Sequence, residues 1–399
     1  MKWIALFLLT LCITVSSISV TITTITYIGA FIFLLLSCGW NTCFKKIVEN
    51  KAALSFWLLG ALFVAGTFYS TSTRHLIFQD LQKQHWLFMT PFFIVFIAEE
   101  VWRKRMVNAF LWAMIGVLLL SYFKVFLHNE FVTIMSPIKI YPAGSVFMDR
   151  IVQSFAMNIA AFICGYRCLF EKENRLFYAI IFLLMGVNII FMSDGRTGYG
   201  IFFLLLCYLG LIRFKWTGVF FAAFSGMIII ACAFFFSPHF QSRIKDMVHH
   251  YQYSHQINHR TSIGQRLEMW HIAKKMIHER PWIGYGTGGI RTALPDVVSP
   301  QEHKYTPSLD YVESIYLNFM LEFGVVGLIV LLTAIFMQFK TTFELPKHYR
   351  CLMQFVLIAT FFGGLFNAFL VSFPIAHMYA LFAALCFSAK QSSGVAHDQ

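Results

Sequence analysis

Long apolar runs recur along almost the whole chain, and they limit its possible folds more than any other feature. Apolar residues make up 58% of the 399 residues and charged residues only 13%, whereas a soluble domain carries about a quarter charged residues. A helix needs about 20 mostly apolar residues to cross a bilayer. The sequence therefore predicts an all-α polytopic membrane protein with about twelve transmembrane helices. The expected spans are 3–17, 20–38, 53–70, 86–99, 107–126, 152–169, 177–192, 199–212, 217–236, 312–337, 351–371 and 375–388.

One long polar stretch, residues 237–311, interrupts this pattern. It contains arginines, lysines and many of the fourteen histidines. We expect transmembrane helices 1–9 in residues 1–236, a large loop with amphipathic helices in 237–311, and helices 10–12 in 312–388. A polar cytoplasmic tail should follow in 389–399.

The short connecting segments show a bias in positive charge. Lysine and arginine gather near residues 45–51, 103–105, 167–175 and 340–350, which are alternate connections in the predicted order of spans. Cytoplasmic loops carry such an excess, so both ends should be cytoplasmic and the long loop should face outward, which in a bacterium would mean the periplasm. The same rule accounts for the net charge of +12, so nucleic acid is not needed as a partner.

A helix is expected inside the long loop. Ser262 and Gln265 fit a capping box, which predicts a helix over about 263–279, and Pro281 marks its end. Arg266 falls in the first turn, where the helix N-terminus adds partial positive charge that favours a phosphate. One predicted face carries Arg266, Trp270, Ala273 and Ile277, and the polar face carries Glu268, His271, Lys275 and His278.

Arg196 lies in a tight polar turn, Ser193–Gly198, between two apolar spans on the predicted outer side. An arginine there can simply extend to lipid headgroups. Its planar guanidinium can also grip a phosphate through paired hydrogen bonds. Arg266 has the same two interpretations, with a surface helix arginine as the simpler one.

The glycine-rich run 284–289 resembles a phosphate loop only superficially. No strand precedes it and no helix clearly follows, so a dinucleotide-binding motif is rejected. A turn that brings backbone close to a substrate and a flexible connector both remain open.

Glu313 stands just before an apolar span. Its carboxylate could accept a proton from an attacking hydroxyl, or it could only cap the helix, and a helix N-terminus should lower its pKa. His303 lies ten residues earlier and could reach the same place. Neither the histidines nor the nine cysteines show metal-ligand spacing, so we expect no metal and no cofactor, and we interpret the cysteines as small buried hydrophobic residues.

Three stretches together resemble a known family. They are Ser-x-x-Arg-Thr at 193–197, TSIGQRLEMWHIAKKMIHERPWIGYGTGG at 261–289 and YLNFMLEFGVVG at 316–327. In this order they resemble the bacterial O-antigen ligase and O-antigen polymerase superfamily. Asp149-Arg150 with Asn158 is a weaker match. The resemblance covers roughly residues 150–330.

The resemblance implies a metal-independent glycosyltransferase of the bacterial inner membrane. Its donor would be a glycan on undecaprenyl diphosphate, and its acceptor lipid A–core (a ligase) or a growing glycan (a polymerase). Arg196 and Arg266 would hold the donor diphosphate. Arg150, Arg291 and His303 are further candidates for the site. Ligases of the family usually have His-Asn before this span, whereas this chain has Glu313-Ser314, which weakens ligase relative to polymerase.

Two rival classes use the same span pattern. A transporter or flippase would need ionisable residues in the middle of its spans, and the predicted spans carry almost none. A purely structural scaffold would leave Arg196 and Arg266 on one side unexplained. We therefore expect an O-antigen ligase, with a polymerase as the alternative, embedded in membrane lipids.

Overall fold

The computed structural model describes residues 1–37, 39–127, 144–193, 195–236, 262–297 and 311–390, and in these ranges every regular element is helical. Long apolar segments favour helix, because a helix pairs its backbone N–H and C=O groups within the segment, where a membrane offers no other partners. The elements are α1 (Lys2–Val15), α2 (Val20–Leu35), α3 (Trp40–Glu49), α4 (Lys51–Thr67), α5 (Arg74–Lys83), α6 (His85–Phe96), α7 (Glu100–Leu127), α9 (Arg150–Phe170), α10 (Arg175–Val187), η1 (Asn188–Met192), α11 (Arg196–Phe236), α13 (Ser262–Glu279), α14 (Ile290–Val297), α16 (Ile315–Thr342), α17 (Lys347–Gly363) and α18 (Phe373–Phe387).

Within the described ranges, five helices are long and apolar enough to cross a membrane. They are Glu100–Val125, Arg150–Phe170, Arg175–Met192, Arg196–Phe220 and Ile315–Thr342, and a pair bent by 94°, Cys43–Glu49 with Lys51–Thr67, would make a sixth. Helices α1, α2 and α18 are apolar but shorter. The chain thus has the architecture of a polytopic membrane protein, while the number of twelve spans stays a prediction.

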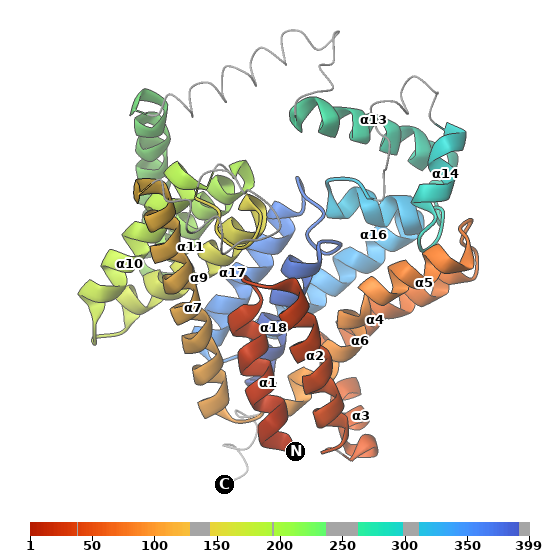
Figure 1. Ribbon diagram of the computed structural model, residues 1–399, viewed down its shortest axis with the longest axis horizontal. Coiled ribbons are helices and arrows are strands. Elements are labelled where there is room, and N and C mark those ends of the chain that lie inside the picture. Colours follow the sequence, from red (N-terminus) through yellow and green to blue (C-terminus); the bar gives the residue numbers. More distant parts are fainter. Residues whose placement is uncertain (38, 128–143, 194, 237–261, 298–310, 391–399) are drawn as a thin grey trace.

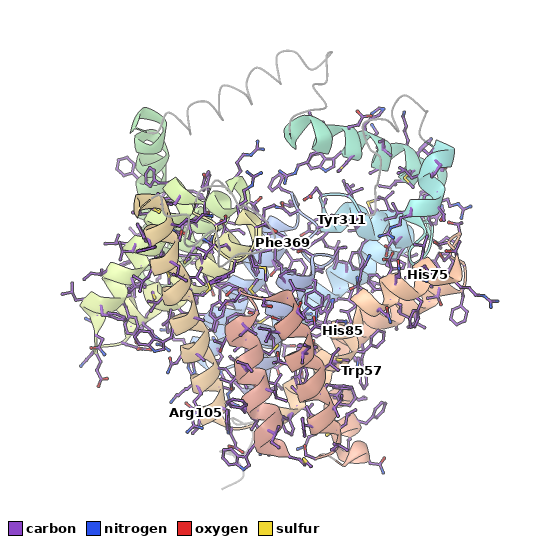
Figure 2. The ribbon with its side chains drawn as sticks, viewed as in Figure 1. Trp57, His75, His85, Arg105, Tyr311 and Phe369 are labelled. Carbon is purple, nitrogen blue, oxygen red and sulfur yellow. The ribbon has the colours of Figure 1, made fainter. Side chains whose placement is uncertain are left out.

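The bundle has two distinct ends. Helices α13 and α14 lie across one end, above α16, and the N-terminus lies at the other (Figure 1). Tyr311 and Phe369 lie toward the end that α13 covers, whereas Arg105 lies at the opposite end (Figure 2).

Close ion pairs lie at the N-terminal end of the molecule. Lys2 Nζ lies 2.6 Å from Glu99 Oε1, and Lys390 Nζ lies 2.5 Å from Glu344 Oε2. Lys2 and Lys390 therefore both sit beside segments that the charge bias assigns to the cytoplasm. Lys390 belongs to the predicted tail, and the rest of that tail, 391–399, lies outside the described residues.

Helix α13 confirms the helix predicted over 263–279, but its faces differ from the prediction. Ile272, Ala273 and Met276 are buried, and Glu268 is only 5% exposed although it was predicted on the solvent face. These apolar residues form a small second core with residues of α14, α16 and the loops beside them: Tyr285, Ile290, Ala293, Leu294, Val312 and Leu321. The prediction of a solvent-exposed polar face is wrong at Glu268, because this side of α13 is covered in the folded chain.

Helix α16 is broken at Gly324. Residues 281–286, which we call the strap, form backbone hydrogen bonds with α16 on both sides of this break. Gly324 has φ +62°, a left-handed conformation that glycine adopts at no steric cost. Below the break, the amides of Val325 and Val326 donate to the carbonyls of Pro281 (2.8 Å) and Trp282 (3.3 Å). The strap also donates two hydrogen bonds to the part of α16 before the break: the amides of Tyr285 and Gly286 donate to the carbonyls of Leu321 (2.9 Å) and Glu322 (2.8 Å). Four backbone groups that the break would leave unpaired are satisfied in this way.

The predicted span 351–371 ends early. Helix α17 stops at Gly363, and residues 364–372 form turns before α18. The amide of Ile315 donates to the Gly364 carbonyl at 2.8 Å, and Phe369 packs edge-on against Phe155 with ring centroids 5.2 Å apart. This 364–372 turn segment is thus fixed between α9 and the start of α16, at the end that α13 covers.

Cys43 is disulfide-bonded, which corrects the interpretation of the cysteines as small buried hydrophobic residues. It lies on α3, in a segment that the charge bias places in the cytoplasm, whereas disulfides persist mainly in oxidising compartments. Among the cysteines that the structure describes, six others are thiols, including the buried Cys12, Cys164, Cys351 and Cys386.

Candidate functional site

Four separate parts of the chain meet around the guanidinium of Arg266. Its Nη2 donates to Asn367 Oδ1 at 3.1 Å and lies 3.8 Å from Glu313 Oε2. Asn367 in turn donates from Nδ2 to Thr197 Oγ1 at 2.7 Å. One network therefore joins the N-terminal parts of α13 and α11, the residue before Ser314 and the 364–372 turn segment. In this network the Arg266 and Glu313 side chains are 25% and 29% exposed.

Glu313 is not the helix cap. Ser314 fills that position and its side chain accepts from the Leu317 amide. Burial raises the pKa of Glu313, the Arg266 charge lowers it, and the nearby Asp149 carboxylate raises it, with a net rise. The expectation of a lowered pKa is wrong because desolvation of the carboxylate outweighs the attraction of the positive groups around it. A carboxylate with a raised pKa is a stronger base.

Arg196 begins α11, directly before Thr197 of this network. The turn that carries it is packed tightly on the start of α9: Ser154 Oγ and Ser193 Oγ are 2.5 Å apart, and Asn158 Nδ2 donates to the Gly198 carbonyl at 3.2 Å. A side chain at Gly195 would meet Ser154 Oγ at 3.0 Å and the Arg150 carbonyl at 3.5 Å. The structure therefore places the backbones of Arg150 and Arg196 side by side and both beside the Arg266 network.

Three helices begin near this network. Helices α9, α11 and α16 begin at Arg150, Arg196 and Ile315. Amide groups at a helix start lack internal partners, but the Asp149 carboxylate already accepts from the first amides of α9, and the Ser314 side chain accepts from an amide of α16. The positive charge of this region therefore comes mainly from its arginines, which suit an anion that carries more than one charge.

The other predicted site residues fall elsewhere. Arg291 lies in the first turn of α14, which packs beside the later part of α13, whereas Arg266 is at the start of α13. His303 lies outside the described residues.

The glycine-rich run is neither a substrate loop nor a flexible connector. The Thr287 amide donates to the Gly66 carbonyl at 3.3 Å and Thr287 Oγ1 to the Phe63 carbonyl at 2.6 Å. A side chain at Gly286, which has φ +78°, would lie 2.5 Å from the Ser70 Cα. The glycines allow the chain to pack against α4 and α16, so their role is structural.

Sequence reasoning missed two polar groups. Asn367 was placed inside a continuous span, although the Gly363-Gly364 pair just before it is a signal for a break. Glu322 stands at the α16 break and shares a small cavity with Asp80 and Lys83.

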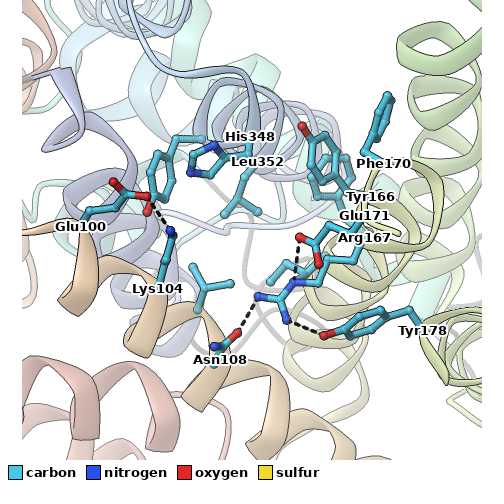
Figure 3. Close-up of a pocket in the computed structure, with 14 residues that line it drawn as sticks. Glu100, Lys104, Asn108, Tyr166, Arg167, Phe170, Glu171, Tyr178, His348 and Leu352 are labelled. Carbon is cyan, nitrogen blue, oxygen red and sulfur yellow. Dashed lines mark hydrogen bonds and ion pairs between the residues drawn. The ribbon is translucent and has the colours of Figure 1, made fainter. Parts of the chain in front are cut away.

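A cavity of about 560 Å³ lies at the other end of the molecule, between α7, α9, α10 and α17 (Figure 3). Arg167, which lines it, is 17 residues beyond Arg150 on α9, or about 25 Å away at 1.5 Å per residue. This cavity is therefore separate from the Arg266 network. Among the described residues, no group of three His, Cys, Asp or Glu side chains is placed to hold a metal ion.

Comparison with known families finds one match. Residues 180–332 match the family model described as O-antigen ligase. The matched residues include Arg196, Arg266 and Glu313. The match supports the resemblance of the sequence to the O-antigen ligase and polymerase superfamily. A search of curated proteins found no match.

Proposed function

We propose, from the place of residues 180–332 in the O-antigen ligase and polymerase superfamily, that the chain is a membrane glycosyltransferase and specifically an O-antigen ligase. It would move a glycan from undecaprenyl diphosphate to lipid A–core at the periplasmic face of the inner membrane. The observation that carries the proposal is the meeting of Arg266 with Glu313, Asn367 and Thr197, next to Arg196.

Arg196 and Arg266 are proposed to bind the two phosphates of the donor. Each charge-assisted hydrogen bond of this kind contributes roughly 1.5–3 kcal/mol. Charge develops on the diphosphate as the glycosidic bond breaks, so groups fixed in advance around it stabilise the transition state more than the ground state. The neutral Asn367 amide holds Arg266 in place without cancelling its charge.

Glu313 is proposed to be the base. The acceptor hydroxyl attacks the anomeric carbon, the bond from that carbon to the diphosphate oxygen breaks, and undecaprenyl diphosphate leaves. The hydroxyl proton passes to the Glu313 carboxylate. The net rise in its pKa fits this role.

Donor binding would also prepare this base. The Arg266–Glu313 separation of 3.8 Å is longer than a hydrogen bond, so a diphosphate can compete for the guanidinium. Once Arg266 turns to the diphosphate, the group that lowers the pKa of Glu313 is engaged elsewhere, while burial and Asp149 continue to raise it. The carboxylate would become most basic when the donor is bound.

An O-antigen or exopolysaccharide polymerase is the second candidate, because the chain has Glu313-Ser314 where related ligases have His-Asn. Both candidates use the same donor and differ in acceptor. A lipopolysaccharide gel of a strain that lacks the gene separates them. Core without any O-antigen, with long polymer left on the carrier, identifies a ligase, and core capped with one repeat identifies a polymerase. Unchanged banding rejects both.

A further inference from the structure

The 560 Å³ cavity at the N-terminal end is lined by two kinds of surface. Its charged part consists of Glu100 and Lys104 from α7 with Arg167 and Glu171 from the end of α9 (Figure 3). Its apolar part comes mainly from α9 and α17 and includes Phe162, Ile163, Phe170 and Leu352. A ligand that fills it must be charged at one end and apolar at the other.

Arg167 is held in a fixed position by partners that do not cancel its charge. Nη2 donates to Asn108 Oδ1 at 2.5 Å and Nη1 to the Tyr178 hydroxyl at 3.1 Å, and both partners are neutral. The Glu171 carboxylate is 3.7 Å from Nε, too far for a good hydrogen bond. A guanidinium fixed in this way is suited to a phosphate.

The charges of the cavity balance. Lys104 Nζ lies 2.7 Å from Glu100 Oε1, and the two side chains are 65% and 52% exposed. His348 also lines the cavity, and burial lowers its pKa, so its imidazole is neutral at neutral pH. A zwitterion can pair with both the two cations and the two carboxylates, whereas an anion that took the two cations would leave the two carboxylates without a partner of opposite charge.

We propose that this cavity binds a zwitterionic phospholipid with a primary amine in its headgroup. The phosphate contacts Arg167 and Lys104, the ammonium contacts Glu100 and Glu171, and an acyl chain lies along Phe162, Ile163 and Leu352. The charge bias puts this end at the cytoplasmic leaflet, where lipids settle between helices beside basic residues. The site is separate from the proposed transfer site and does not depend on it.

The test is lipid retention by the purified full-length protein, measured by native mass spectrometry. The protein is exchanged into detergent with equal amounts of phosphatidylethanolamine and phosphatidylglycerol of identical acyl chains. We expect phosphatidylethanolamine to be retained about tenfold over phosphatidylglycerol, the effect of one charge-assisted contact. Equal retention, or a preference for phosphatidylglycerol, overturns the proposal.

Variants locate the site and separate a zwitterion from an anion. Glu100→Gln should remove the preference for phosphatidylethanolamine without lowering phosphatidylglycerol retention, whereas Lys104→Gln should lower retention of both lipids. Both side chains are more than half exposed, so the fold should survive, and a thermal unfolding curve checks this. Lys340→Gln, on an exposed position of α16 outside the cavity, is the matched control. An unchanged lipid ratio in Glu100→Gln, or equal losses in the control, contradicts the proposal.

Discussion

At the N-terminal end of the molecule Lys2 and Glu99 lie 2.6 Å apart and Lys390 and Glu344 2.5 Å apart, whereas at the other end Arg266 and Glu313 are 3.8 Å apart. The close pairs join partly exposed side chains, and their charges cancel. Arg266 is instead hydrogen-bonded to the neutral Asn367 amide, and the Glu313 carboxylate lies beyond hydrogen-bond distance from it. The comparison teaches that the function of a charged residue here depends on its partner: a carboxylate partner anchors it, and a neutral partner prepares it for a ligand.

The largest effect should come from removing either of the two arginines that are proposed to bind the donor diphosphate. Arg266→Ala or Arg196→Ala should lower glycan transfer by about 100-fold or more, as expected for one lost donor to the transition state. Arg266→Lys should also transfer poorly, because lysine cannot make the planar paired contact. O-antigen banding on gels measures the effect, with immunoblots of membranes to show equal insertion. Normal banding would refute the assignment of the arginines.

Glu313→Gln should lower transfer by about tenfold to a hundredfold, at the lower end of the range for a general base. In the wild type, activity requires the ionised carboxylate, so it should fall as the pH drops through the pKa of Glu313. Since that pKa is raised, the fall should begin at a higher pH than for an ordinary carboxyl group. The pH profile of transfer by purified protein measures this, and Glu313→Gln should lack the acidic limb. An acidic limb that persists in the variant would assign the titration to another group.

Asn367→Ala should lower transfer by about tenfold, because Arg266 loses one hydrogen bond that fixes its direction. The loss should appear mainly as weaker donor binding, and Asn367→Asp should be worse because a carboxylate would neutralise the guanidinium. Transfer rates at increasing donor concentration measure this difference. If Asn367→Asp matched the wild type, the contrast between neutral and charged partners would be wrong.

The smallest effect is expected at the N-terminal end. Lys2→Ala removes an exposed ion pair worth less than about 1 kcal/mol, and it should leave transfer unchanged. The same gels and a thermal unfolding curve check both quantities. A loss of transfer as large as that of Arg266→Ala would show that the two ends do not differ in the way proposed.

Local sequence signals predicted the local structure well. The apolar runs predicted helices, and Pro281 predicted that α13 ends near residue 279, where the helix ends at Glu279. The roles of Arg196, Arg266 and Glu313 in a site stay predictions. The local successes share one reason: periodicity, caps and prolines act within a few residues.

The failures concern contacts between distant segments. Asn367 looked like part of a span because its tie to Arg266 joins residues 101 positions apart. Glu268 looked solvent-facing because the partner of α13 could not be seen in the sequence. The direction of the pKa shift of Glu313 depends on the burial of its carboxyl group, which is a tertiary property. The role of the glycine run could not be predicted because it depends on the break in α16, against which these residues pack.

The strap has a further consequence for how the site is built. Going back along the chain from the strap leads through α13 to Arg266, and going back from Gly324 leads through the upper half of α16 to Glu313. Four main-chain hydrogen bonds at the break join the segment that leads to Arg266 and the segment that leads to Glu313. The backbone geometry of the break therefore helps to set the distance between the Arg266 guanidinium and the Glu313 carboxylate.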